Sequence, residues 1–190
     1  MNKYTIRTAT SADTDTLLEI YAPYVENTAI TFEYVVPSHD EFKNRIVQIS
    51  KKYPYLVAEE NHEIVGYAYA NTFKPRAAYD WSVEATIYVK INYKGHGIGK
   101  ALYSALEQAL KQQNITNMNA CIAVPEVDDE YLTHNSVQFH THMGFQPVGT
   151  FHKCANKFHR WYNMIWMEKV IGEHLENPEI VKAYSEIKTI

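Results

Sequence analysis

The feature that most constrains this fold is the segment 81–112, where an apolar strand pattern leads through a glycine-rich loop into an amphipathic helix. Residues 81–89 alternate between apolar and polar side chains, as a half-buried strand does. The loop that follows reads Lys94-Gly95-His96-Gly97-Ile98-Gly99-Lys100. Glycines at alternate positions let a backbone approach a ligand, and a helix N-terminus adds about half a positive charge. The segment therefore predicts a pyrophosphate site.

Two common phosphate-binding motifs do not match this loop. A P-loop continues as Gly-Lys-Ser/Thr, whereas Ala101 follows Gly99 and Lys100. A dinucleotide-binding fingerprint reads G-x-G-x-x-G near the first strand, whereas this loop reads G-x-G-x-G in mid-chain. The loop therefore does not belong to either of these commoner classes of phosphate-binding loop.

The loop resembles the Q/R-x-x-G-x-G/A signature of the GNAT superfamily of N-acetyltransferases, which holds the pyrophosphate of acetyl-CoA. Lys94 stands where that family usually has Gln or Arg. Other segments are similar to the phosphinothricin N-acetyltransferase branch, namely residues 53–59, 66–70, 73–89 and 136–145. The similarity runs from about Thr5 to Glu168. The resemblance implies a GNAT fold with acetyl-CoA as co-substrate.

Length and composition fit one enzyme domain. With 190 residues, 46% of them hydrophobic, the chain can bury one large core and is too short for two full domains. We expect a catalytic domain at residues 1–171 and a C-terminal tail at 172–190. A net charge of −4 without a basic tract argues against a nucleic-acid partner.

Cysteine usage and hydropathy bear on location. Cys121 falls in a predicted strand and Cys154 in a late loop, so neither a disulfide framework nor a CxxC metal site is available. Residues 1–10 contain no apolar leader segment, and the apolar run 64–70 is far shorter than a membrane span. We therefore expect a cytoplasmic protein with no membrane partner.

Apolar periodicity and turn signals predict strands interspersed with helices. Ser11 or Asp13 would cap the first helix and Ser38 the second, which Pro54 would stop. The predicted strands are 4–8, 55–60, 64–73, 81–89, 117–123, 145–150 and 161–169, with a hairpin turn near 61–62 and a late helix at 133–143. This order implies a single-domain α/β fold whose mixed sheet is flanked by helices.

Glu84 is the candidate catalytic base. It stands on the polar face of strand 81–89 among largely apolar neighbours, so a cleft there would desolvate its carboxylate and raise its pKa. From the residues alone, a solvated strand carboxylate is the alternative. The resemblance implies a catalytic role, because Val-Glu-x-Thr-x-Tyr-Val is where the phosphinothricin branch carries its catalytic glutamate.

The work asked of such a base depends on the amine. At pH 7, deprotonation costs about 4.6 kcal/mol for a lysine-like amine and only about 1.4 kcal/mol for an α-amine. A single glutamate suits the second case. Strand N–H groups near Ile87 and Val89 would stabilise the oxyanion that forms when the amine attacks the thioester.

The resemblance also implies an acetyl-CoA site. The strand edge Ile87, Tyr88 and Val89 would hydrogen-bond the pantetheine arm. The other donor-site residues would be Lys94, Gly95, His96, Gly97, Ile98, Gly99, Lys100, Thr133 and Ser136. Thr133 stands where relatives usually have Asn. His140 would protonate the departing CoA thiolate, although a helix histidine taken alone is more often structural or exposed.

The acceptor side is implied in the same way. Phe32 falls where the branch places an aromatic acceptor-pocket residue, and Trp161 lies in a segment, 157–163, that resembles a loop closing over the acceptor. Arg76 would bind an acidic or dipolar oxygen through two parallel hydrogen bonds, unless it is an ordinary exposed arginine. Relatives are homodimers whose two subunits contribute to each acceptor site. We expect a homodimer that acetylates the α-amine of a phosphinothricin, methionine sulfone or methionine sulfoximine type of amino acid.

Other activities stay open from the sequence. Acetylation of a polyamine, a peptide N-terminus or a lysine needs a groove that sequence alone does not rule out. A non-catalytic acyl-CoA-binding protein would lack the carboxylate of Glu84, which is present. A metal is not expected, because His140 and His142 point to different faces of a helix, and His152 and His159 have no cysteine or carboxylate at ligand spacing.

Overall fold

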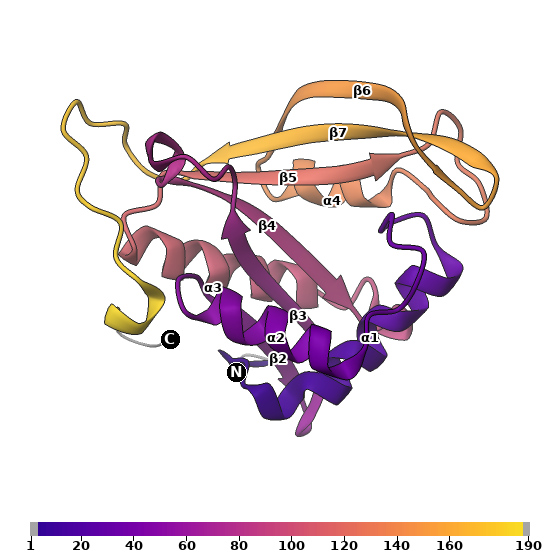
Figure 1. The fold of residues 1–190 in the computed structure, drawn as a ribbon, viewed down its shortest axis with the longest axis horizontal. Coiled ribbons are helices and arrows are strands. Elements are labelled where there is room, and N and C mark those ends of the chain that lie inside the picture. Colours follow the sequence, from indigo (N-terminus) through magenta and orange to yellow (C-terminus); the bar gives the residue numbers. More distant parts are fainter. Residues whose placement is uncertain (1–3, 188–190) are drawn as a thin grey trace.

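The computed structural model describes residues 4–187, so residues 1–3 of the predicted domain and 188–190 of the predicted tail lie outside it. One seven-stranded sheet has the order β1-β2-β3-β4-β5-β7-β6 (Figure 1). Its strands are β1 (Thr5–Thr8), β2 (Tyr55–Glu60), β3 (Glu63–Thr72), β4 (Ser82–Val89), β5 (Asn117–Val124), β6 (Gln146–Lys157) and β7 (Arg160–Val170). The α-helices are α1 (Thr14–Asn27), α2 (His39–Ser50), α3 (Ile98–Gln112) and α4 (Asn135–His142). The predicted α/β order is confirmed.

Capping explains where the first two helices begin, with one correction. Ser38 caps α2, and its side chain accepts a hydrogen bond from Glu41 N at 3.2 Å. Asp13 is the N-cap residue of α1, one of the two predicted, but its side chain makes no capping hydrogen bond to that helix. Thr10 caps a short 3₁₀ turn at Ser11–Asp13 that leads into α1. The Asp13 carboxylate accepts a hydrogen bond from Thr10 N at 2.7 Å and completes a capping box.

Helices cover both faces of the β2–β4 part of the sheet. Tyr55 and Val57 face α1 and α2. Leu56 and Ala58, on the opposite face of the same strand, pack against α3. The core stripe of α3 has helical spacing and is fully buried, comprising Leu102, Leu106 and Leu110.

The sheet forks between β4 and β5. These strands run parallel and are the one parallel pair among the described strands. Their register pairs residues 82–84 with 117–119 and then stops. Beyond Glu84 the two strands diverge, as Figure 1 shows. The fork leaves one edge of β4 without a neighbouring strand.

Backbone groups of β4 point into this fork. Asn119 Nδ2 of β5 donates to Val83 O of β4 at 3.1 Å, so the N–H and C=O groups of odd-numbered β4 residues point toward β5. Lys90 N donates to Val65 O of β3 at 2.9 Å, so even-numbered groups point toward β3. Because peptide groups alternate along a strand, the groups that face the fork are those of Ala85, Ile87 and Val89.

The β6–β7 hairpin is longer than predicted. β6 continues to Lys157 rather than ending at 150, so Cys154 lies in a strand and not in a loop. Phe158 and His159, with φ of 52° and 61°, form the turn. The predicted loop at 157–163 is therefore the closed end of a hairpin. Residues 146–154 are all exposed, so this part of β6 lacks the alternation that marks a half-buried strand.

Other element ends differ from the predictions by a few residues. α2 ends at Ser50, before Pro54, so the proline does not stop the helix. α4 spans Asn135–His142 rather than 133–143, and the predicted turn residues 61–62 both have positive φ, of 52° and 66°. Helix ends are weakly specified by local sequence, because terminal turns can be helical or 3₁₀ at similar cost.

The residues after β7 fold back onto the body of the protein, at the left of Figure 1. Trp81 Nε1 donates to Glu179 O at 2.7 Å, and Gln113 Nε2 donates to Lys182 O at 2.7 Å. The ring of Tyr184 is buried in the main core. The described part of the predicted tail, 172–187, thus contacts the chain before β4 and the end of α3.

Candidate active site

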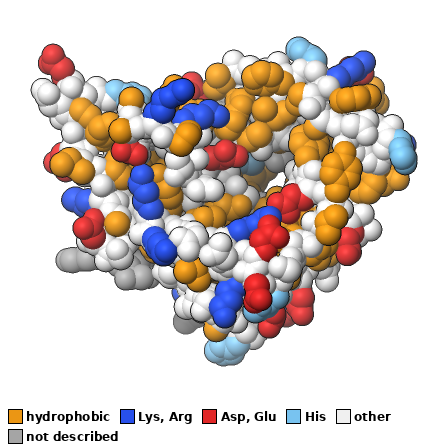
Figure 2. Space-filling view, in the orientation of Figure 1, with side chains coloured by type: hydrophobic (Ala, Val, Ile, Leu, Met, Phe, Trp, Pro, Cys, Tyr) orange, Lys and Arg blue, Asp and Glu red, His pale blue; other side chains and the backbone are white. Residues whose placement is uncertain are grey.

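One cavity lies at the fork of the sheet, and a second lies at the glycine loop, residues 94–100. The fork cavity, of about 240 Å³, is lined by residues 84–88 of β4, 120–123 of β5, 30–32, Tyr69, Tyr103, Ser136, His140 and Met164. The loop cleft, of about 590 Å³, is lined mainly by the glycine loop and the starts of α3 and α4. Figure 2 shows the molecule hollowed right of centre, with hydrophobic side chains around the hollow.

The two cavities meet. Ile30, Ile87 and Ser136 line both of them. A long ligand anchored at the glycine loop can therefore follow the open edge of β4 and place its end in the fork cavity. This arrangement suits a transfer reaction, in which the donor enters from one cavity and the acceptor from the other.

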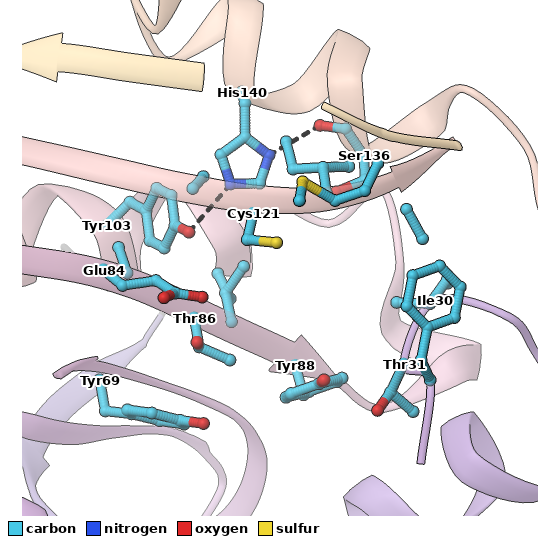
Figure 3. Close-up of a pocket in the computed structure, with 17 residues that line it drawn as sticks. Ile30, Thr31, Tyr69, Glu84, Thr86, Tyr88, Tyr103, Cys121, Ser136 and His140 are labelled. Carbon is cyan, nitrogen blue, oxygen red and sulfur yellow. Dashed lines mark hydrogen bonds between the residues drawn. The ribbon is translucent and has the colours of Figure 1, made fainter. Parts of the chain in front are cut away.

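Glu84 lines the fork cavity (Figure 3). It is the last β4 residue that pairs with β5. Burial raises the pKa of its carboxyl, and the positive charge of Lys74 partly opposes this shift. A carboxylate with a raised pKa is a stronger base. Glu84 can therefore take a proton from an amine that enters the cavity.

Tyr103 and His140 form a second polar pair in the fork cavity (Figure 3). His140 Nδ1 is 2.7 Å from Ser136 O, and a carbonyl oxygen can only accept, so Nδ1 carries the proton. The other nitrogen, Nε2, then accepts the hydroxyl proton of Tyr103 at 3.0 Å. Burial lowers the pKa of His140, so the neutral ring is favoured.

The glycine loop shows why glycine is needed at two of its positions. Gly95 and Gly97 have φ of 83° and 86°, in the left-handed region that side chains disfavour. Gly97 is the N-cap of α3, so the first N–H groups of that helix face the loop cleft without a capping side chain. This is the geometry expected of an anion site.

Gly99 is glycine for a different reason. It lies inside α3, and a Cβ atom there would be 2.9 Å from Cε2 of Phe139 on α4. The residue therefore allows α3 and α4 to pack closely, in addition to lining the loop cleft. The ring of Phe139 also lines the loop cleft.

Polar and charged side chains surround the loop cleft. Lys94 Nζ lies 5.0 Å from the ring centre of Tyr24, and desolvation lowers the pKa of this lysine. Lys100 and Thr133 also line the cleft. Asn135, which sequence reasoning missed, lines it two residues after Thr133 and carries the kind of amide that Thr133 lacks.

The structure brings some predicted acceptor residues together and leaves others apart. Phe32 lines the fork cavity, with its ring centre 6.5 Å from that of Tyr162. Among the described residues that line the two cavities, Arg76, Trp161 and His96 do not appear. Arg76 is exposed on the loop before β4, and Trp161 is 60% exposed. Roles for these three residues stay predictions.

Tyr88 also differs from expectation in orientation. It pairs with Tyr67 of β3, so its peptide group faces β3 and its side chain lines the fork cavity. The ring packs against Tyr21, Tyr24 and Tyr67. A backbone contact from Tyr88 to a ligand in the fork is therefore not favoured, whereas Ile87 and Val89 present their peptide groups there.

Sequence reasoning missed two side chains near Glu84. Tyr103 sits at an inward position of α3 and reads as an ordinary core aromatic. Lys74 lies over the rings of Phe73 and Trp166, at 4.8 Å and 5.1 Å, and its charge acts on Glu84. The one sequence signal for a role of Lys74 near the site is its position two residues before Arg76, the predicted acceptor-binding cation.

Two further observations bear on the kind of site. Within residues 4–187, no cluster of three or more His, Cys, Asp or Glu side chains could hold a metal ion. Over the same described range, no helix is long and apolar enough to cross a membrane. The polar and titratable side chains that line the fork cavity include those of Glu84, Tyr103 and His140.

Comparisons with known proteins agree with this geometry. Residues 6–166 match the Acetyltransferase (GNAT) domain family. A phosphinothricin N-acetyltransferase of Streptomyces viridochromogenes is 31% identical over 159 residues, covering 84% of this chain and 83% of the relative. An L-methionine sulfoximine/L-methionine sulfone acetyltransferase of Salmonella typhimurium is 29% identical over 174 residues, covering 90% and 96%. A crystal structure of a GNAT superfamily phosphinothricin acetyltransferase from Sinorhizobium meliloti in complex with AcCoA superposes with a TM-score of 0.84 at 32% identity, covering 96% and 98%.

The forked sheet, the glycine loop at a helix N-terminus and the two meeting cavities agree with the family that these comparisons identify. The chain belongs to the acetyltransferase (GNAT) family and is an N-acetyltransferase. The similarity to the phosphinothricin N-acetyltransferase branch is confirmed.

Proposed function

We propose that this enzyme uses acetyl-CoA to acetylate the α-amine of a small amino acid that carries a second oxygen-rich group, of the phosphinothricin, methionine sulfone or methionine sulfoximine type. The observation that carries the proposal is the position of Glu84, in a cavity of about 240 Å³ that meets the loop cleft. The cavity accommodates a small acceptor, and the names of the relatives point to this acceptor class.

The donor would bind along the loop cleft. Its pyrophosphate would lie on the N–H groups of the glycine loop, near Lys94 and Lys100. Its pantetheine arm would follow the edge of β4, where the peptide groups of Ile87 and Val89 face the fork. The thioester would then lie where the two cavities meet.

The reaction is a direct transfer. Glu84 takes a proton from the α-ammonium group, and the freed nitrogen attacks the thioester carbonyl to form a C–N bond. The N–H group of Ile87, which lines both cavities, stabilises the tetrahedral oxyanion, while the peptide group of Val89 is left for the pantetheine arm. Collapse of this intermediate breaks the C–S bond, the nitrogen loses its second proton to solvent, and the CoA thiolate receives the hydroxyl proton of Tyr103, which neutral His140 orients. Solvent then returns a proton to Tyr103 and removes the one that Glu84 took up.

Recognition of the acceptor would involve Phe32 on one side of the fork cavity and a cation for its acid group. Arg76 offers a planar guanidinium group, and the positive charge of Lys74 acts on Glu84. Trp161 would cover the acceptor.

We also infer a homodimer, because the exposed β6 strand carries Val148 and Phe151, 59% and 57% exposed, and apolar edge strands favour pairing with another surface. A cytoplasmic location follows from acetyl-CoA as donor, and the free thiols of Cys121 and Cys154 suit it.

An acceptor screen tests the proposal. The enzyme is incubated with acetyl-CoA and single acceptors, release of CoA thiol is followed, and NMR identifies the acetylated nitrogen. Stoichiometric N-acetylation of the α-amine of methionine sulfone or phosphinothricin supports the proposal. Thiol release with spermidine or a lysine peptide alone would transfer the assignment to another amine class.

A further inference from the structure

Lys157 is a buried ammonium group outside the catalytic pairs. It is the last residue of β6 and is 2% exposed. Its Nζ donates to Val25 O at 2.7 Å and to Thr31 O at 2.8 Å. Among the described residues, no carboxylate forms an ion pair with it. A buried charge is costly unless hydrogen bonds satisfy it, so these two bonds account for its retention in the fold.

The two acceptors of Lys157 belong to a single stretch of chain. Val25 O lies in the last turn of α1, where carbonyl groups lack helical partners and the helix dipole favours a positive charge. Thr31 O lies in the connection between α1 and α2, residues 28–38, which we call the acceptor loop. Residues 30–32 of this loop line the fork cavity. Lys157 thus ties the hairpin end to a wall of that cavity.

Few other polar contacts hold the acceptor loop against the hairpin. The hydroxyl of Tyr34 donates to Asn156 O, but the side chain of Tyr34 is 70% exposed. The stacked rings of Phe32 and Tyr162 add an apolar contact. Burial lowers the pKa of Lys157, and the charge of Glu33 partly opposes this shift. Among these contacts between the acceptor loop and the hairpin, the hydrogen bonds of the Lys157 ammonium are the buried polar ones.

We propose that Lys157 is a positioning residue, which fixes the acceptor loop and thereby sets the affinity of the fork cavity for the acceptor. The inference rests on the proposed function insofar as the fork cavity receives the acceptor. This role predicts that loss of Lys157 weakens acceptor binding and leaves acetyl-CoA binding nearly unchanged. Loss of the two hydrogen bonds would release Thr31 and Phe32, which line the fork cavity and not the loop cleft. Ile30, which lines both, keeps its hydrogen bond to Thr28 Oγ1 at 3.2 Å.

Lys157→Met tests the proposal, because Met keeps the length of the side chain and removes the donors. Lys153→Met is the matched control, since Lys153 lies on the same strand with its side chain 60% exposed. We expect Lys157→Met to raise KM for methionine sulfone by at least about tenfold, with KM for acetyl-CoA within about twofold of wild type. Lys157→Gln, which keeps one amide donor, should fall between wild type and Lys157→Met.

Amide hydrogen exchange provides a readout that does not depend on the acceptor. Exchange at residues 28–34 should accelerate in Lys157→Met and not in Lys153→Met. Equal rises in both KM values, or a lowered Tm with unchanged KM values and unchanged exchange at 28–34, would overturn the proposal and leave Lys157 a purely stabilising residue. If Lys157→Met does not fold, the same comparison with Lys157→Gln decides. If wild type acetylates none of the proposed amino acids, the proposed function fails, and the exchange measurement still decides the role of Lys157.

Discussion

The hydroxyl of Tyr103 on α3 donates to Nε2 of His140 on α4, across 3.0 Å inside the fork cavity. The bond joins the helix that follows the glycine loop to the helix that flanks the cavity. It also turns the unprotonated nitrogen of His140 toward Tyr103 rather than toward open space. Tyr103, which sequence reasoning missed, is therefore the group that would protonate a leaving thiolate, with His140 as its hydrogen-bond partner.

Replacement of Tyr103 by Phe keeps the packed ring and removes only the hydroxyl. We expect kcat to fall by about 10²-fold, with little change in KM for acetyl-CoA, because the proton path to the thiolate is interrupted. Steady-state kinetics with methionine sulfone measures both values. Tyr184→Phe removes another largely buried hydroxyl, bonded to Thr8 at 3.0 Å, and should leave kcat unchanged. Similar kcat values for the two variants would exclude Tyr103 from the reaction.

Replacement of Glu84 by Gln keeps the shape and removes the base. We expect kcat/KM to fall by roughly 10²- to 10⁴-fold at neutral pH. In wild type, activity should decline as the pH falls through the raised pKa of Glu84, because the protonated carboxyl cannot accept a proton. That acidic limb should vanish in Glu84→Gln. A pH profile that keeps the same limb in the variant would assign it to another group.

The same substitution should stabilise the protein. Because the folded-state pKa of Glu84 is raised above its unfolded value, the folded state binds the proton more tightly, and stability is lost as the pH rises through this interval. Glu84→Gln should therefore have a higher Tm than wild type at pH 7, and the gain should shrink toward pH 4. Thermal unfolding monitored by circular dichroism at both pH values measures this. A lower Tm at pH 7 would mean that the carboxylate is stabilised in the folded state.

Substitutions at Gly97 and at Gly99 should have different main effects, the first on acetyl-CoA affinity and the second on the packing of α3 against α4. In Gly97→Ala, the positive φ of 86° costs about 1–2 kcal/mol with little steric contact, so the loop should distort and acetyl-CoA affinity should fall by about tenfold or more. In Gly99→Val, crowding against Phe139 should cost about 1–3 kcal/mol of folding free energy. Calorimetry and urea unfolding measure the two effects. Unchanged affinity in folded Gly97→Ala would remove the loop from the donor site.

Short-range sequence patterns predicted the elements whose structure depends mainly on neighbouring residues in the chain. The alternation of residues 81–89, the glycines and the start of α3 are short-range features, so the strand that carries Glu84 and the loop that leads into α3 were predicted correctly. Tyr103 and Lys157 could not be assigned in this way. The first has the spacing of a core residue, and the second is buried only because the hairpin end meets a loop more than 120 residues earlier in the chain.

The errors have a common physical cause. Most of β6 is exposed, so its sequence carries no buried face, and the prediction ended the strand near Thr150. Lys74 was missed because the direction of its side chain depends on rings that include Trp166 of the distant strand β7. Contacts of this kind are set by the tertiary fold.

Direct competition between acceptors tests the central claim most directly. Wild-type enzyme receives limiting acetyl-CoA and equal concentrations of methionine sulfone, spermidine and a lysine peptide with a blocked N-terminus, and mass spectrometry measures the product ratios. These ratios equal the ratios of kcat/KM. The α-amine is easier to deprotonate than a lysine amine by about 3 kcal/mol, so we predict N-acetylmethionine sulfone in at least about tenfold excess over either other product. A dominant acetyl-lysine or acetylspermidine product would contradict the account.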